Sequence, residues 1–229
     1  MAIDATDIKN IANRRAKVER VKTARRRPVS STNWLRRQLN DPFAREARAN
    51  GYRSRAAFKI LEIDEKFKIF KKGQKVVDLG SSPGGWSQVI VEKVGIGNVL
   101  AVDLLKMEEI PGVKFFQRDF LGEGMTELVF ECFGGGKCDA VASDMAANTT
   151  GDKKTDHLRT LNLLENALEF SLKILKNGGS FVGKIFQGGL ERELFEKIRK
   201  NFTAAKHFKP LSSRKESVET YLVALGFRG

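Results

Sequence analysis

Apolar positions change their period along this chain of 229 residues, and the change predicts an α/β protein. From Lys75 onward, short apolar runs alternate with longer stretches of helical period. The runs predict strands at Lys75–Leu79, Asn98–Asp103, Val113–Gln117, Asp139–Ser143, Ser180–Ile185 and Thr220–Leu225. The stretches between them predict helices at Trp86–Val94, Thr126–Phe130, Asp156–Leu175 and Leu190–Asn201. Strands that alternate with helices form parallel sheets covered on both faces, and we expect that architecture here.

The last predicted strand has a different partner. Another strand candidate lies near His207–Lys209, shortly before the strand at Thr220–Leu225. The segment Pro210–Glu219 joins the two candidates and is long enough for a hairpin loop. Such a hairpin puts one antiparallel strand into an otherwise parallel sheet.

The N-terminal part of the chain is organised differently. Ser54 is a good cap for a helix with a buried apolar stripe, and a shorter helix with a broken apolar face is predicted from Trp34 to Phe43. Residues 1–31 contain almost no large apolar side chains and predict a weakly helical or flexible arm. We therefore divide the chain into an arm, residues 1–31, and a domain, residues 32–229.

Positive charge is concentrated near the N-terminus. The whole chain has a formal net charge of +13, from 41 Lys and Arg against 28 Asp and Glu. Residues 1–58 contain 15 of these basic residues and 5 of the acidic ones, a net charge of +10. A basic arm beside a nearly balanced domain favours a polyanionic partner. A solvated, disordered tail without a partner is the alternative.

Composition argues against several other classes of protein. No apolar run approaches the ~18 residues of a membrane span, and the N-terminus lacks the apolar segment of a secretion signal. The two cysteines, Cys132 and Cys138, match no metal-binding spacing, and the chain has only two histidines. We therefore expect a cytoplasmic protein with reduced thiols, no metal site and no contact with a membrane.

The most informative motif is KVVDLGSSPGGWS, residues 75–87. A strand that ends in a glycine turn and leads into a helix brings backbone close to a nucleotide-like ligand. Pro83 interrupts the GxGxxG pattern that holds pyrophosphate, and Asp78 places a carboxylate where an anion would be repelled. The motif therefore favours a cationic cofactor, S-adenosylmethionine, over a nicotinamide dinucleotide.

Carboxylates follow several of the predicted strands. Asp103 lies about 20 residues beyond the glycine loop, where an acidic residue often binds the ribose hydroxyls of a nucleotide, although it could also cap a helix. Asp119 is placed to accept from an adenine amino group, and a turn role explains it equally well. Asp144 precedes the polar loop 145–151, and candidates nearer the next helix can cap that helix. We therefore favour a functional role for Asp144.

Lys184 lies inside a strand that is expected to be largely buried, SFVGKIF. Lysine is rarely buried without a partner, and burial together with a nearby carboxylate can tune it as a general base. The alternative is a lysine at a strand end that reaches solvent. Lys59 and Glu219 are uninformative when each is considered alone.

Taken together, these motifs resemble one family. The segments SRAAFKILEID (54–64), DLGSSPGGWS (78–87), RDF (118–120), SDMAAN (143–148), GGSFVGKIFQG (178–188) and SSRKESVETYLVALG (212–226) are similar to those of the FtsJ/RrmJ (RlmE) ribosomal RNA methyltransferases. The likeness covers about residues 32–228. It implies a Rossmann-like methyltransferase fold that depends on S-adenosylmethionine, with a mostly parallel seven-stranded sheet that includes one antiparallel strand.

The resemblance also implies a function and a set of site residues. It implies a monomer that methylates the ribose 2′-hydroxyl of a uridine in 23S ribosomal RNA within the large ribosomal subunit. The implied catalytic residues are Lys59, Asp144, Lys184 and Glu219. The implied cofactor-binding residues are Gly84, Gly85, Trp86, Asp103, Asp119 and Asp144. The basic arm is longer than in the family pattern, so its role does not carry over.

The expected reaction is an in-line displacement in which the ribose 2′-oxygen attacks a methyl carbon. Lys184 is the expected base, with Asp144 and Lys59 assisting it and Glu219 orienting Lys184 or the hydroxyl. In the alternative, Lys184 stays charged and only orients the hydroxyl. A related methyltransferase acting on tRNA or an mRNA cap, a non-catalytic RNA-binding protein and a nicotinamide-dependent dehydrogenase are the competing functions. The dehydrogenase leaves Lys184 and Glu219 unexplained.

Overall fold

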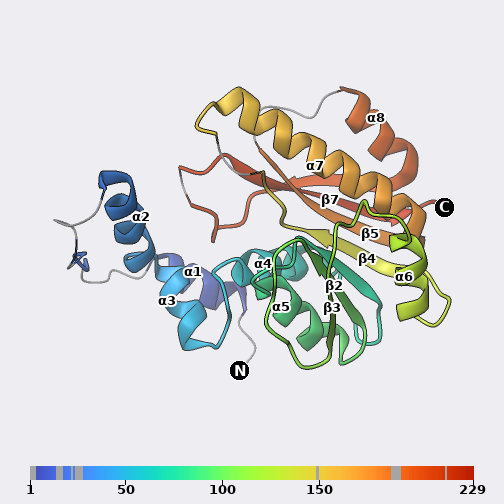
Figure 1. Cartoon of the computed structure of the whole chain (residues 1–229), viewed down its shortest axis with the longest axis horizontal. Helices are drawn as coiled ribbons and strands as arrows, with labels where there is room; N and C mark the ends of the chain where they lie inside the picture. Colours follow the sequence, from blue (N-terminus) through green and yellow to red (C-terminus); the bar gives the residue numbers. More distant parts are fainter. Residues whose placement is uncertain are drawn as a thin grey trace.

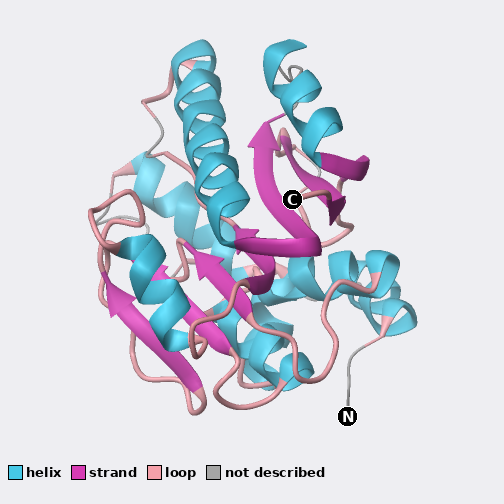
Figure 2. Ribbon diagram, turned by 90° about the vertical axis from the view of Figure 1, so that its right-hand side faces the viewer, coloured by secondary structure: helices cyan, strands magenta, loops and turns pink. Residues whose placement is uncertain are grey.

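The computed structural model describes residues 4–13, 18–21, 23, 28–147, 150–186, 192–214 and 216–229. Within them, a mixed sheet lies between two layers of helices (Figures 1 and 2). The strands are β1 (Val76–Leu79), β2 (Val99–Asp103), β3 (Val113–Gln117), β4 (Cys138–Ser143), β5 (Leu175–Phe186), β6 (Phe202–Phe208) and β7 (Glu219–Phe227). The helices are α1 (Ala5–Asn13), α2 (Val29–Leu39), α3 (Pro42–Ala49), α4 (Ala57–Phe67), α5 (Gly85–Val94), α6 (Met125–Cys132), α7 (Lys153–Ile174) and α8 (Arg192–Asn201).

The seven described strands follow the order β3-β2-β1-β4-β5-β7-β6. β1 pairs in parallel with both β2 and β4, so the strand order reverses between them. β7 is antiparallel to β5 on one side and to β6 on the other. The predicted fold class, a mostly parallel sheet with one antiparallel strand, is therefore confirmed. In such sheets the ligand lies beyond the carboxyl ends of the strands, where the order reverses.

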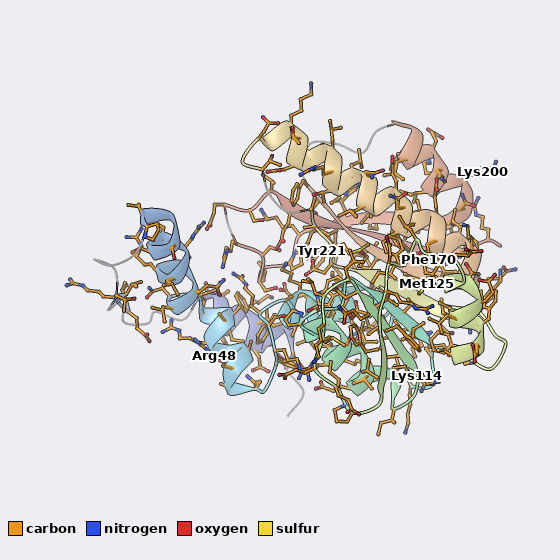
Figure 3. All side chains as sticks on the ribbon, viewed as in Figure 1. Arg48, Lys114, Met125, Phe170, Lys200 and Tyr221 are labelled. Atoms are coloured by element: carbon orange, nitrogen blue, oxygen red, sulfur yellow. The ribbon has the colours of Figure 1, made fainter. Side chains whose placement is uncertain are left out.

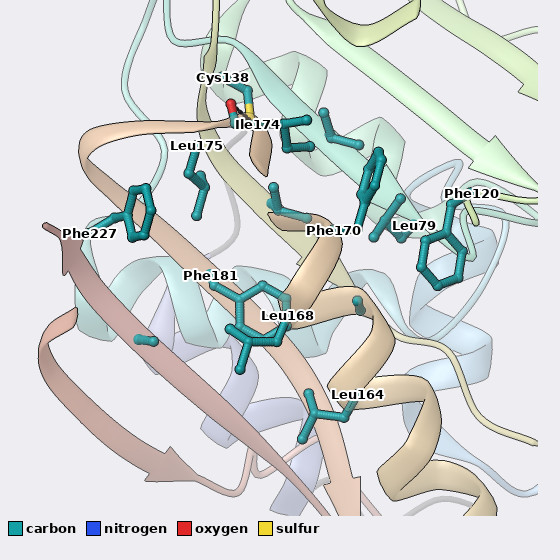
Figure 4. Packing of buried hydrophobic residues seen from close by; sticks show 14 of the residues in the cluster. Leu79, Phe120, Cys138, Leu164, Leu168, Phe170, Ile174, Leu175, Phe181 and Phe227 are labelled. Carbon is teal, nitrogen blue, oxygen red and sulfur yellow. Dashed lines mark hydrogen bonds between the residues drawn. The ribbon is translucent and has the colours of Figure 1, made fainter. Parts of the chain in front are cut away.

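Side chains of the central strands alternate between two apolar cores. Val77, Leu79 and Val141 pack in one cluster with residues of α6, α7 and α8. Val76 and Ala140 face the opposite way and pack with residues of α4 and α5. Figure 4 shows the first cluster, where Leu164 and Leu168 of α7 lie against Phe181 of β5. Because both faces of the sheet are covered, its strands are nearly continuous apolar runs, as the sequence pattern indicated.

Helix α4 is buried on all sides, since every residue from Ala57 to Asp64 is buried. In Figure 1 it lies beside α5, between the sheet and the N-terminal helices α1 and α3, which pack against it. This position explains why polar side chains of α4 have specific partners. Among them, Lys59 is only 8% exposed, and it points toward the end of the sheet where β7 begins.

The N-terminal segment differs from its prediction in two ways. The single helix expected from Trp34 to Phe43 is two helices, because Asp41 caps α3 through the N–H groups of Phe43 and Ala44. Pro42 then starts α3 at a position where proline fits. Within the predicted arm, α1 packs onto the domain and buries Ile8 and Ile11 against α3 and α4. The arm therefore includes a docked helix, and the boundary placed after residue 31 falls inside α2.

Other predicted boundaries shift by a few residues. Helix α7 begins at Lys153, three residues before the predicted start, because Asp152 caps it by accepting from the N–H of Thr155. Leu175, the predicted last residue of that helix, is the first residue of β5 and pairs with Cys138. The register then shifts before Ser180 pairs with Ala140. The predicted start of the next helix at Leu190 lies outside the described residues.

Candidate active site

The glycine loop between β1 and α5 requires glycine on steric grounds. Gly84 has φ +110°, and a Cβ there would lie 2.7 Å from Ile110 Cδ1. A Cβ on Gly85 would lie 2.2 Å from Ser54 Oγ. Positive φ and such close approaches exclude other residues. The loop therefore brings backbone N–H groups at the start of α5 to the edge of the sheet.

Asp78 lies in β1 beneath this loop and is only 1% exposed. Its Oδ2 accepts a hydrogen bond from the Ser87 hydroxyl at 2.6 Å, and its Oδ1 has no partner among the described residues. Burial raises the pKa of Asp78 to about 7, and the charges of Asp144 and Asp103 contribute to the rise, against the effect of the Ser87 hydrogen bond. A buried carboxylate oxygen without a partner is costly, so this side chain is suited to a cationic ligand.

Asp103 and Asp119 lie where the sequence predicted, next to the ends of β2 and β3. Asp103 accepts from the N–H groups of Ser82 and Leu105, at 2.8 and 2.7 Å, and so ties β2 to the glycine loop. Asp119 is exposed and accepts from the N–H of Leu121 at 2.9 Å. A carboxylate has about four acceptor positions, so both groups can still accept from a ligand.

Trp86 has a structural role in addition to its predicted one. Its side chain is only 3% exposed, and its Nε1–H donates to the carbonyl of Ala56 at 2.9 Å. Its ring lies 5.6 Å from that of Tyr221. The indole therefore joins α5 to α4 inside the core. Only the backbone of Trp86, in the first turn of α5, is placed for contact with a ligand.

The four predicted catalytic residues converge, although they come from α4, the end of β4, β5 and β7. Lys184 Nζ lies 2.8 Å from Asp144 Oδ1 and donates to the carbonyl of Asp144 at 2.6 Å. Lys59 Nζ lies 3.0 Å from Glu219 and 3.7 Å from Asp144 Oδ2. Glu219 therefore pairs with Lys59, whereas we expected it to orient either Lys184 or the substrate hydroxyl. Two cations and two carboxylates alternate in a row, Lys184–Asp144–Lys59–Glu219.

Asp144 is the centre of this row. Burial alone would raise the pKa of Asp144, but the charges of Lys184 and Lys59 outweigh that effect. With hydrogen bonds from Lys184 and Tyr221, they hold the pKa below its usual value. Asp144 is therefore ionised near neutral pH and attracts both lysine head groups. The lysine side chains are only 9–10% exposed, so these ion pairs are poorly screened by solvent.

Sequence reasoning did not single out Tyr221. Its hydroxyl donates to Asp144 Oδ1 at 2.5 Å, and it lies in the middle of the molecule, far from surface residues such as Lys114 and Lys200 (Figure 3). Burial, together with the charges of Asp144 and Glu219, raises the pKa of Tyr221 well above its usual value. Tyr221 is the cross-strand partner of Lys184 and lies two residues after Glu219. Knowing which residues of β5 and β7 lie opposite each other would have placed Tyr221 next to Lys184.

Arg53 binds backbone carbonyls of the glycine loop and of a second segment. Its guanidinium donates to the carbonyls of Pro83, Glu108 and Glu109, at 3.3, 2.7 and 2.7 Å. It therefore fastens the glycine loop to the segment after β2. Three carbonyl acceptors use most of its donors, so it is a brace for the cofactor-side loop.

The described residues were also compared with the requirements of a metal site and of a membrane-spanning helix. Among them, no cluster of three or more His, Cys, Asp or Glu side chains could hold a metal ion. None of the helices, over the ranges that the structure describes, is both long and apolar enough to span a membrane.

Fold and site together define a Rossmann-like α/β protein with a ligand site at the carboxyl edge of its sheet. Comparison with known proteins identifies the family. The model of the FtsJ-like methyltransferases matches residues 52–227. Proteins named ribosomal RNA large subunit methyltransferase E, from Rickettsia bellii and Rickettsia canadensis, are 56% and 53% identical over 222 residues, which cover 94% of this chain and 97% of each relative. The chain therefore belongs to the FtsJ-like methyltransferase family.

A solved structure agrees with this assignment. The crystal structure named as that of a ribosomal RNA methyltransferase from Plasmodium falciparum superimposes with a TM-score of 0.69 at 31% sequence identity. The match covers 78% of this chain and all of the other. The expected family and fold are confirmed, and a methyltransferase requires a methyl donor.

Proposed function

We propose that this protein transfers a methyl group from S-adenosylmethionine to the ribose 2′-hydroxyl of a uridine in 23S ribosomal RNA, within the large ribosomal subunit. Relatives that are more than half identical over nearly the whole chain carry a large-subunit ribosomal RNA methyltransferase name. The net charge of +13 suits a nucleic acid substrate. The proposed protein acts as a monomer in the cytoplasm, where its substrate subunit is found.

Several features of the chain fit S-adenosylmethionine, which supplies a methyl group activated by a positively charged sulfur. Asp78 offers a buried carboxylate oxygen without a described partner, which suits a cation. Glycine at positions 84 and 85 lets the loop pack closely against Ile110 and Ser54, which sets the course of its backbone. In our proposal the backbone of Gly84, Gly85 and Trp86 contacts the cofactor. Asp103 accepts from its ribose hydroxyls and Asp119 from its adenine amino group, and Asp144 borders the methyl-transfer position.

The catalytic proposal rests on Lys184. Its ammonium nitrogen is fixed at two points, by the side chain and the carbonyl of Asp144, at the edge of the sheet where the glycine loop lies. In our mechanism Lys184, in its neutral form, accepts the proton of the 2′-hydroxyl as the oxygen–carbon bond forms and the carbon–sulfur bond breaks. Asp144 then stabilises the resulting ammonium. This fixed lysine, with side-chain exposure of 9%, is the observation that carries the proposal.

The other two residues of the row set the charge around Lys184. Lys59 lies between Asp144 and Glu219, so its charge balances the two carboxylates. Glu219 in turn fixes Lys59 and is itself held by the hydroxyl of Ser213 at 2.9 Å. We therefore assign Lys59 and Glu219 to electrostatic and positioning roles.

The direct test is transfer of a labelled methyl group from S-adenosylmethionine to three substrates, each assayed separately. The substrates are large ribosomal subunits that lack the modification, free 23S ribosomal RNA and tRNA. We expect transfer to the subunits, with the label at a 2′-oxygen of uridine. Preferred labelling of tRNA would contradict the substrate. RNA binding without transfer to any substrate would favour a non-catalytic RNA-binding protein.

A further inference from the structure

A cavity next to the proposed catalytic row is not used by the mechanism above. It has a volume of about 460 Å³ and is lined by Arg37, Gln38, Arg55, Lys59, Arg214, Glu216, Ser217 and Glu219. These residues come from α2, from α4 with the turn before it, and from the loop between β6 and β7 with the first residue of β7. Lys59 and Glu219 line this cavity and also belong to the row of charges Lys184–Asp144–Lys59–Glu219, so the cavity adjoins that row.

Two of the cationic side chains in this cavity are held in place by one buried carboxylate. Arg55 pairs with Asp41 and also donates to the carbonyl of Ser212. Arg214 lies 3.5 Å from the same oxygen of Asp41. Asp41 is only 7% exposed and is fixed because it caps α3. This arrangement anchors the β6–β7 loop to the N-terminal helices, and it holds two guanidinium groups at one wall of the cavity.

The cavity still has donors to offer to a ligand. Arg37 is exposed, and its Nε–H donates only within its own helix, to the carbonyl of Asn33 at 3.4 Å. Among the described residues, no carboxylate pairs with it. The Arg214 side chain is 31% exposed, and its pairing with Asp41 is loose. A guanidinium has five N–H donors, so both residues can bind an oxyanion in two-point geometry.

The chemistry of the proposed substrate supplies such an anion. In RNA the 2′-hydroxyl and the 3′-phosphodiester are attached to adjacent carbons of one ribose. A ribose that presents its 2′-oxygen to Lys184 and Asp144 therefore brings a phosphate within a few ångströms of them. The nearest cation, Lys59, is already paired with Glu219 and Asp144. An additional positive group must lie beside Lys59 to receive the phosphate, and the cavity places arginines there.

We propose that this cavity is a phosphodiester subsite, in which Arg37 and Arg214 bind the phosphate on the 3′ side of the methylated ribose. Arg55 acts indirectly, as a positioning residue that holds Asp41 and the β6–β7 loop. The subsite rests on the proposed function, because the identity of the anion follows from a ribose substrate. It fixes the position of the reactive ribose and reads no base sequence.

The test compares Arg37→Gln and Arg214→Gln with Arg228→Gln. Arg228 is a matched control, since it is exposed and its guanidinium also makes a single long bond to a backbone carbonyl, Lys200 O at 3.4 Å. It follows β7, at the opposite end of the molecule from α2 (Figure 1). Methyl transfer to unmodified large subunits is measured at several salt concentrations, and affinity for S-adenosylmethionine is measured separately.

We expect each of the first two variants to lose about 10- to 100-fold in kcat/KM, mainly through KM, as for a lost hydrogen bond to a charged group. The slope of log kcat/KM against log salt should become shallower by about one unit per variant. Cofactor affinity should stay unchanged, and Arg214→Lys should recover part of the activity. Arg37→Gln keeps the test sound if Arg214→Gln disturbs its loop, because Arg37 has no described contact outside its helix.

The possible failures can be told apart. If the unaltered protein methylates large subunits but Arg37→Gln and Arg214→Gln behave like Arg228→Gln, the subsite is wrong and the proposed function stands. If the unaltered protein methylates no RNA, the proposed function is wrong, and the subsite falls with it. An equal loss of cofactor affinity in both variants would show a structural effect and would also overturn the subsite.

Discussion

The phenol of Tyr221 donates a hydrogen bond to Oδ1 of Asp144, the same oxygen that pairs with Lys184. One carboxylate oxygen therefore receives a neutral donor from β7 and a cation from β5. The two donors are cross-strand neighbours, so the register of the antiparallel pair sets their separation. With Lys59 of α4 near its other oxygen, Asp144 is held in one orientation by side chains from β5, β7 and α4.

Tyr221→Phe tests this orientation. The variant loses a donor that helps to lower the pKa of Asp144, but both lysines remain. We expect kcat to fall by about 10- to 100-fold, since a hydrogen bond to a charged group contributes ~1.5–3 kcal/mol. The pKa of Asp144 should rise toward its ordinary value, and NMR titration of its side-chain carboxyl measures this rise. Phe227→Leu, which alters a buried ring of the same strand outside the site, is the control. An unchanged kcat together with an unchanged pKa of Asp144 would show that the Tyr221 hydroxyl does not contribute to the site.

Lys184→Arg separates a base from an orienting cation. Arginine keeps the charge and can donate to Asp144, but it does not release a proton at any ordinary pH. If Lys184 accepts the proton, we expect a loss of about 10²–10⁴-fold in kcat with cofactor affinity largely retained. Lys184→Ala should be at least as impaired. Near-normal turnover of Lys184→Arg would assign Lys184 an orienting role, and near-normal turnover of Lys184→Ala would remove it from the mechanism.

Asp78→Asn should stabilise the protein in the absence of ligand. The folded-state pKa of Asp78 is raised to about 7 from an ordinary value of 3.8, so the folded protein holds an extra proton between these pH values. Stability therefore falls as pH rises through this window, because the charged form is buried. Asparagine does not titrate, so the variant should gain roughly 2–4 kcal/mol at pH 7.5 and little at pH 4.

Denaturant unfolding at both pH values measures this difference, with the exposed Asp119→Asn as the control. Asp78→Asn should also weaken binding of S-adenosylmethionine, since it removes the carboxylate offered to the cation. A variant that is equally stable at both pH values relative to the unaltered protein would show that Asp78 is not strained by its burial.

The basic arm is best tested by neutralisation, because α1 packs against the domain and its removal would uncover α4. Replacing Arg14, Arg15, Arg25, Arg26 and Arg27 by glutamine removes charge and leaves Ile8 and Ile11 in place. We expect a shallower dependence of RNA affinity on salt, by about 0.7–0.9 log units per lost phosphate contact. Neutralising Arg199 and Arg228 should change the slope less. An unchanged slope in the arm variant would leave the arm without a role in RNA binding.

The layer structure of the fold could be predicted from the sequence because the apolar runs are buried on both faces. The antiparallel strand could be predicted because Pro210–Glu219 suits a hairpin loop. The two helices around Asp41 were missed, since a polar residue followed by proline was not recognised as a cap and a first helical position. The docking of α1 was missed because Ile8 and Ile11 supply only two apolar side chains among many charges.

At the site, too, features set by local sequence pattern could be predicted, and features set by packing could not. Carboxylates at strand ends could be placed because parallel strands end at one edge. The pairing of Glu219 with Lys59, and not with Lys184, depends on how far α4 lies from the end of β7, which no sequence period specifies. The carbonyl partners of Arg53 lie about 30 and 55 residues away in the chain, so no local pattern indicates its bracing role. Side-chain partners across long separations are set by packing, and not by local pattern.

The contact between Lys59 and Glu219 joins residues 160 positions apart in the chain. All the strands of the sheet lie between them in sequence or begin at Glu219, so the row of charges is assembled only after the sheet is complete. During synthesis from the N-terminus, a nascent chain that already contains the glycine loop still lacks both Glu219 and Tyr221. In the proposed mechanism, methyl transfer therefore requires the completed sheet, so activity would report on completed folding.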